Sequence, residues 1–239
     1  MTTIYSAQFK NLFFTYVLSK GAISNGAVIL LDGLPSNPQS KNELIQELSS
    51  SGYDVFFPRY EGTWESKGTF LERAPSEAII EFIEALKKGE KIGNKKYLAN
   101  SVFLLGASFG GGVTLDIATK YSADKVCVVS PAISFKAVNG IETLGDYLKK
   151  AYSKDYRFNL KDWQKLIIDE IWNLKSGRIN APNNVWIVTG KNDNQVKEID
   201  VIDFAEAKGI RFKTCDLGHI TLSKIPNPIL LEIIDFFSK

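Results

Sequence analysis

An apolar stretch at residues 102–105 leads straight into the motif Gly106-x-Ser108-x-Gly110, and a helix-like stretch follows it. A serine at the top of a sharp turn from strand to helix projects its hydroxyl into solvent, which is the geometry that a nucleophile needs. The two glycines permit a strained turn and a close approach of the helix to the strand, where a Cβ would clash. The motif therefore predicts a strand–turn–helix unit and makes Ser108 the candidate nucleophile.

Strand and helix signals alternate along most of the chain, which indicates an α/β fold with a mostly parallel sheet and helices on both faces. The 239 residues suit one large domain or two small ones. Because no repeat or linker divides them, we expect a single domain over residues 1–239. We expect strands at 9–18 (one or two), 27–31, 55–58, 102–105, 125–130, 185–189 and 211–215. We expect helices at 41–50, 75–88, from the serine turn to about residue 121, near 198–208, and at 228–237.

The alternation stops between residues 132 and 180, where the chain is helical, aromatic and free of strand signals. Two interpretations are open: a pair of helices packed on the sheet edge, or a small helical cap over a pocket. About 50 residues is long for an ordinary connection, which favours the cap. Two of its aromatic residues, Trp163 and Trp172, and Trp64 in the loop after the strand at 55–58 are therefore candidate contacts for an apolar substrate.

A serine hydroxyl is a poor nucleophile at neutral pH and needs an adjacent base. His219 is the only histidine of the chain, and it lies in a loop just after the last predicted strand. A lone histidine is often a plain surface or core residue, but this one occurs where a strand end can present it to the serine. Asp193, after the preceding strand, is the candidate for orienting the imidazole. Asp200 and Asp203 are weaker candidates, since both fall on the helix that follows.

An oxyanion hole needs backbone N–H groups aimed at the developing negative charge. Phe109, which follows the candidate nucleophile, supplies one such group by its position. The second is expected from the loop after the strand at 27–31, where Leu34 has a free N–H and Pro35 has none.

In these features the chain resembles the α/β-hydrolase superfamily over essentially its whole length. The chain order Ser108, Asp193, His219 is the order of that family's triad. The loop at 60–68 is similar to the corresponding region of small esterases, dienelactone hydrolases and acylaminoacyl-peptidase-like hydrolases. The resemblance implies an eight-stranded, mostly parallel sheet, a triad at its C-terminal edge, and a cap at 132–180 after the sixth strand. Many relatives have His-Gly where this chain has Asp32-Gly33. Asp32 could organise the loop by accepting backbone hydrogen bonds, or could place negative charge near the oxyanion.

The resemblance implies a serine hydrolase that cleaves carboxylic esters through an acyl-enzyme on Ser108. Thioesterases and peptidases use the same machinery, so these substrates stay open. The alternative from another class is a hydrolase-like protein that binds a small ligand without turnover. Neither a cofactor nor a metal is expected, and the expected partner is a small ester or acyl compound. The sequence gives no oligomeric state.

Charge and cysteine content exclude several other classes. Lys and Arg number 29 against 27 Asp and Glu, so the net charge of +2 indicates no nucleic-acid partner. No stretch approaches the ~18–20 apolar residues of a membrane span, and no signal peptide is apparent, so we expect a cytoplasmic protein without a membrane partner. In the strand order of the family, one strand separates those of Cys127 and Cys215, which implies free thiols.

Overall fold

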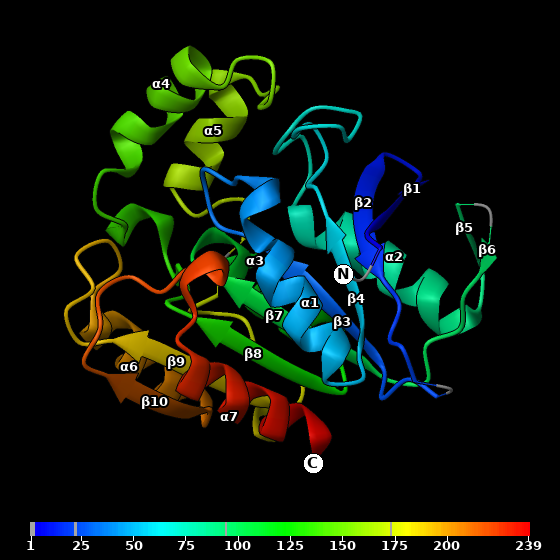
Figure 1. Cartoon of the computed structure of the whole chain (residues 1–239). Coiled ribbons are helices and arrows are strands. Elements are labelled where there is room, and N and C mark those ends of the chain that lie inside the picture. The colour runs from blue at the N-terminus through cyan, green and yellow to red at the C-terminus, as the bar shows by residue number, and fades with distance from the viewer. Residues whose placement is uncertain (1–2, 22, 94, 173) are drawn as a thin grey trace.

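The computed structural model describes residues 3–21, 23–93, 95–172 and 174–239. Its centre is an eight-stranded sheet in the order β1-β2-β4-β3-β7-β8-β9-β10 (Figure 1). β2 pairs antiparallel with β1 and β4. The other six strands of this sheet, β4, β3, β7, β8, β9 and β10, are parallel to one another. The eight strands are β1 Tyr5–Phe9, β2 Leu12–Val17, β3 Ala27–Leu31, β4 Asp54–Pro58, β7 Val102–Ala107, β8 Lys125–Val129, β9 Val185–Gly190 and β10 Arg211–Cys215.

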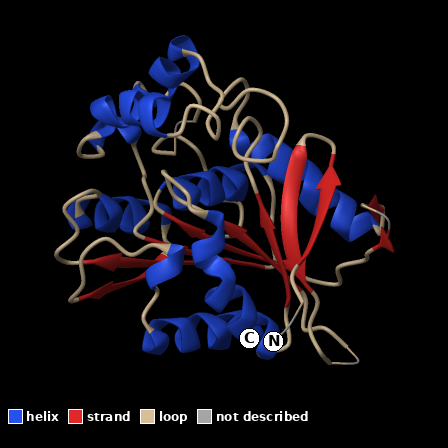
Figure 2. Ribbon diagram, turned by 45° about the horizontal axis from the view of Figure 1, so that its top comes forward, coloured by secondary structure: helices blue, strands red, loops and turns tan. Residues whose placement is uncertain are grey.

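Helices cover both faces of the sheet, as the coloured ribbon in Figure 2 also shows. α1 and α7 lie on one face, and α2, α3 and α6 lie on the other (Figure 1). The apolar side chains of each group pack into the core on their own face. The central strands β3 and β4 are buried at every position, as a strand covered on both faces requires. The α-helices are α1 Asn42–Ser50, α2 Pro75–Lys88, α3 Phe109–Lys120, α4 Ile141–Ala151, α5 Leu160–Ile167, α6 Glu198–Lys208 and α7 Asn227–Ser238.

The predicted fold class is confirmed, and element boundaries differ from the predicted ones by only a few residues. The stretch predicted at 9–18 contains β2 and only the last residue of β1, which begins at Tyr5 and pairs with β2. The helix expected at 41–50 begins one residue later, because a 3-10 turn at Pro38–Lys41 precedes it. A two-stranded hairpin, β5 Lys91–Ile92 with β6 Lys95–Lys96, was not predicted.

The segment at 132–180 lies between β8, the sixth strand of the large sheet, and β9, and it contains α4 and α5. Figure 1 shows these two helices side by side beyond the ends of the central strands. Aromatic side chains of the segment, among them Tyr156, Trp163 and Trp172, are continuous with the core on the α2–α3 face. This segment, residues 132–180, is called the α4–α5 segment below, and it packs against the sheet domain through these aromatic side chains.

Two further sequence-based expectations meet the structure here. Cys127 on β8 and Cys215 on β10 are free thiols, and β9 lies between their strands. Among the described residues, no helix has both the length and the apolar character needed to cross a bilayer.

Candidate active site

Ser108 stands at the turn between β7 and α3, with backbone angles φ 54° and ψ −120°. A positive φ is uncommon for a residue with a Cβ, and such strain collects at functional sites. The flanking glycines are required by close packing: a Cβ on Gly110 would lie 1.9 Å from the carbonyl oxygen of Leu31, and one on Gly106 would lie 2.1 Å from Thr114 Oγ1. The motif thus forms the predicted strand–turn–helix unit, with α3 pressed against β3.

Hydrogen bonds fasten this turn to the segment that follows β8. Ser108 N–H donates to the carbonyl of Val129 at 3.1 Å, and Ser108 C=O accepts from Ala132 N–H at 2.9 Å. Between them, Ser130 Oγ accepts from the N–H of Ile220 at 3.0 Å. Residues 129–132 therefore hold both the serine turn and the loop that carries the histidine.

Asp193 and His219, 26 residues apart in the chain, meet side by side. The loop after β9 reaches the loop after β10 through Asn192 N–H, which donates to the carbonyl of Leu217 at 2.9 Å. Asp193 Oδ2 then lies 2.8 Å from His219 Nδ1. Asp200 and Asp203 lie on α6, as expected, so the structure favours Asp193 as the partner of the imidazole.

The tautomer of His219 follows from this contact. An ionised carboxylate can only accept, so Nδ1 carries the proton and donates it to Asp193 Oδ2. In the neutral ring Nε2 is then an acceptor. Nε2 is buried and has no hydrogen-bond partner among the described residues, so it is not bonded to Ser108 Oγ in this structure. Such contacts often tighten only when substrate is bound.

The carboxylate of Asp193 is held in its charged form. Burial raises its pKa, but the hydrogen bonds from His219 and from the N–H groups of Val196 and Gln195 outweigh burial, so the pKa lies below its ordinary value. Both backbone bonds reach Oδ1 at 2.9 Å. A fixed negative charge beside Nδ1 stabilises an imidazolium, which a base that takes a proton needs.

The loop after β3 runs over the nucleophile. A Cβ on Gly33 would lie 3.1 Å from Ser108 Cβ and 3.5 Å from Ser108 Oγ. Leu34, the predicted second oxyanion donor, is the next residue. Phe109, the predicted first donor, opens α3, and the first N–H groups of a helix have no partner within it. The oxyanion assignment of these two N–H groups stays a prediction.

Asp32, at the start of this loop, forms a buried ion pair. Its Oδ2 contacts Lys41 Nζ, and the two side chains are 6% and 5% exposed. Ser36 Oγ donates to the same oxygen at 2.5 Å. Of the two roles that the sequence left open for Asp32, organising the loop is the one that these contacts favour, with a cation and a hydroxyl as partners of its carboxylate. The ion pair also balances the negative charge of Asp32.

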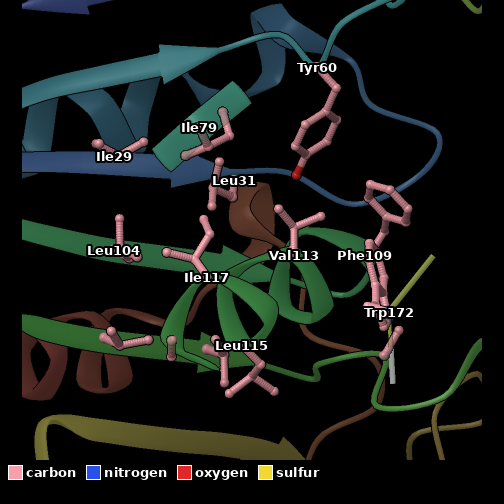
Figure 3. Packing of buried hydrophobic residues seen from close by; sticks show 14 of the residues in the cluster. Ile29, Leu31, Tyr60, Ile79, Leu104, Phe109, Val113, Leu115, Ile117 and Trp172 are labelled. Carbon is pink, nitrogen blue, oxygen red and sulfur yellow. The ribbon is translucent and has the colours of Figure 1, made fainter. Parts of the chain in front are cut away.

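The three tryptophans predicted to line a pocket have different surroundings. Trp163, 2% exposed, lies between α4 and α5, where a Cβ on Gly145 would lie 2.5 Å from its Nε1. Its contact with substrate stays a prediction. The ring centroids of Trp172 and Phe109 lie 5.5 Å apart, and Figure 3 shows the two residues next to each other. Trp64 is part-exposed and packs on Tyr152. Contact of Trp64 and Trp172 with substrate stays a prediction.

The sequence did not predict four polar side chains that hydrogen-bond to the loops of the site: Lys41, Ser36, Tyr60 and Ser130. Lys41 lies at the start of a predicted amphipathic helix, where a lysine is normally exposed, so nothing in the sequence predicts its burial. The described residues contain no group of three or more His, Cys, Asp or Glu side chains placed to share a metal ion.

The family model described as serine aminopeptidase, S33 matches residues 22–178 of the chain. This range includes the serine turn and most of the α4–α5 segment, and ends before Asp193 and His219. No curated protein matches the chain by sequence.

Solved structures show the same fold at low identity. An esterase from Pyrococcus furiosus superposes with a TM-score of 0.71 at 18% identity, covering 99% of this chain and 89% of that chain. An enol-lactonase from Burkholderia xenovorans gives a TM-score of 0.64 at 13% identity, covering 98% and 100%. An α/β serine hydrolase without lid from Xanthomonas campestris gives 0.61 at 13% identity, covering 99% and 91%. With the family model spanning most of the chain and the α/β-hydrolase fold complete, this protein belongs to the S33 serine aminopeptidase family of α/β hydrolases.

Proposed function

We propose that the protein hydrolyses carboxylic esters through an acyl-enzyme on Ser108. The observation that carries the proposal is the Asp193–His219 contact of 2.8 Å, which leaves Nε2, buried and without a partner in the described part of the chain, as the acceptor for a hydroxyl proton. The serine turn and the histidine loop both bond to residues 129–132, and the loop of Asp193 bonds to the histidine loop, so the base and the nucleophile belong to one edge of the sheet.

The proposed reaction has two steps. Ser108 Oγ attacks the ester carbonyl while its proton passes to His219 Nε2, and the resulting oxyanion is held by the N–H groups of Leu34 and Phe109. His219 returns the proton to the leaving alcohol, and the acyl-enzyme remains. Water, deprotonated by His219, then attacks the acyl carbon and releases the acid and the serine.

An ester fits the site better than a peptide with a free amino terminus. An aminopeptidase needs an unpaired carboxylate to bind the substrate's ammonium group. Neither buried aspartate of the loops around the serine turn is unpaired, since Asp193 contacts His219 and Asp32 contacts Lys41. Aminoacyl substrates belong in the test because the matching family model is described as a serine aminopeptidase. The structural neighbours that are an esterase and an enol-lactonase support the choice of esters.

A fluorophosphonate probe and a substrate panel test the proposal together. We expect the probe to label the wild-type protein and not Ser108→Ala. We also expect turnover of p-nitrophenyl acetate to fall by about 10⁶ in kcat in Ser108→Ala, as for loss of a triad serine. The panel contains p-nitrophenyl esters of increasing chain length, one thioester and one aminoacyl p-nitroanilide. Absence of labelling at Ser108 would refute the enzyme and leave a ligand-binding protein; faster turnover of the anilide than of any ester would replace esterase by peptidase.

A further inference from the structure

The loop from Asp32 to Ser36 is fastened at both of its ends. Tyr60 Oη donates to the carbonyl of Asp32 at 2.9 Å, and Figure 3 shows this hydroxyl at the end of β3. Ser36 Oγ closes the loop on the Asp32 carboxylate. Leu34, whose N–H is proposed to bind the oxyanion, lies between these two fixed ends. The position of that N–H therefore depends on contacts made two residues away on either side.

The Ser36 end has one more contact, and it comes from the α4–α5 segment. Ser36 N–H donates to Tyr156 Oη at 2.8 Å, across 120 residues of chain. Both residues are buried, with Tyr156 only 3% exposed. Burial raises the pKa of Tyr156 well above its ordinary value, so the acceptor is a neutral hydroxyl at any working pH.

Tyr156 is itself firmly placed. Its neighbours form backbone hydrogen bonds with the loop after β4: Arg157 N–H donates to the carbonyl of Gly62 at 2.8 Å, and Phe70 N–H donates to the carbonyl of Arg157 at 2.6 Å. Tyr156 and Thr63 also form an isolated antiparallel β-bridge. The ring of Tyr156 packs edge to face on the ring of Phe70, with the ring centroids 5.8 Å apart. These contacts fix the position of the Tyr156 hydroxyl, so its hydrogen bond can hold Ser36 in place.

We propose that Tyr156 is a positioning residue for the oxyanion loop, acting through its hydrogen bond to Ser36 N–H. The inference rests on the ester-hydrolase function proposed above and gives the α4–α5 segment a part in transition-state stabilisation in addition to any contact with substrate. Removing the hydroxyl leaves a buried N–H without a partner, which costs free energy until the loop moves. A moved loop displaces Leu34 N–H from the oxyanion and leaves acyl-chain binding intact.

The test is Tyr156→Phe, which keeps the ring packed on Phe70 and removes only the hydroxyl. We expect kcat for p-nitrophenyl acetate to fall about tenfold, less than for loss of a direct oxyanion donor, with KM changed by less than about twofold. A short alkyl trifluoromethyl ketone, which forms a tetrahedral oxyanion on the serine, should bind about tenfold more weakly, because it samples the same N–H groups.

Two matched variants control for the loss of a tyrosine hydroxyl. Tyr152→Phe removes one from the same segment without touching the loop. Tyr97→Phe removes a part-buried one that donates to Asp54 at the start of β4. Both should keep wild-type kcat and ketone affinity, whatever their thermal stability.

The outcomes separate the two proposals. If the wild type is labelled and turns over esters while Tyr156→Phe keeps wild-type kcat and ketone affinity, the positioning role is wrong and the esterase stands. A rise in KM alone would also refute it, since that result describes a substrate contact. A wild type without labelling or turnover refutes both proposals.

Discussion

At the level of single residues, the ion pair of Asp32 with Lys41 balances a buried carboxylate at the start of the loop that carries Leu34, the predicted oxyanion donor. Lys41 Nζ also donates to the carbonyl of Asn37 at 3.1 Å and to Ser40 Oγ at 3.0 Å, so all three ammonium protons have acceptors. A buried ion pair is favourable only when its remaining donors and acceptors are satisfied in this way. The pair therefore contributes loop geometry while adding no net charge to the site.

Asp193 leads to a prediction for the pH dependence of stability. Its pKa is depressed in the folded protein, whereas an unfolded Asp titrates near about 3.9. The folded state thus binds this proton less tightly, so the carboxylate contributes stability that is fully present above about pH 3.9 and is lost as pH falls through the folded pKa. We expect the urea-unfolding free energy to drop more steeply between about pH 5 and pH 2 in the wild type than in Asp193→Asn.

The matched control is Asp203→Asn, which changes an exposed aspartate on α6. Its pH profile should follow the wild type. Equal slopes for the wild type and Asp193→Asn would show that the hydrogen bonds to Asp193 do not lower its pKa. At pH 7 the same Asp193→Asn variant should lose about 10⁴ in kcat, because the amide can hold the imidazole in the wrong tautomer.

At the level of elements, the contact between α3 and β3 sets where the nucleophile stands. We expect Gly110→Ala to destabilise the fold by about 1–3 kcal/mol and to abolish ester turnover, since its Cβ meets the Leu31 carbonyl and α3 must move away with Ser108. Thermal unfolding and p-nitrophenyl acetate turnover measure the two effects. Gly209→Ala is the control: it has a φ of +64° and nothing within 4 Å, so it should cost about 1–2 kcal/mol and leave turnover unchanged. Wild-type activity in Gly110→Ala would contradict the close packing.

The sequence predicts the helices and strands of this protein well, because hydrophobic periodicity and the residues that begin or end an element are local signals. Pro75 at the first turn of α2 and the unbroken apolar run of β3 each determine an element without reference to the rest of the chain. The hairpin of β5 and β6 was missed because two residues per strand carry no periodicity. The bond between Ser36 and Tyr156 was missed for the opposite reason: it joins residues 120 positions apart, and only the folded chain brings them together.

At the level of the whole molecule, the α4–α5 segment shares one hydrophobic core with the sheet. Phe135 and Trp172 pack against Phe109, next to the nucleophile, and backbone bonds tie the segment to other parts of the domain: Asn139 N–H to the carbonyl of Gln195 and Asn180 N–H to that of Ala118. An independently moving lid would expose these rings to water each time it opened. The contacts instead favour cooperative unfolding of segment and sheet as one unit.

This cooperativity can be measured with the chain's own tryptophans. The Trp186→Phe variant keeps three tryptophans: Trp163 and Trp172 in the α4–α5 segment, and Trp64 in the loop bonded to it. Its fluorescence therefore reports on that region, whereas far-UV circular dichroism reports on all helices and strands. We expect the urea transitions from the two probes to coincide, in this variant as in the wild type, because the segment cannot leave without opening the core around Phe109. A fluorescence transition at lower urea than the dichroism transition would mean that the segment unfolds by itself. Tyr156 would then belong to a segment that unfolds separately from the sheet, and its hydrogen bond to Ser36 could position the oxyanion loop only while that segment is folded.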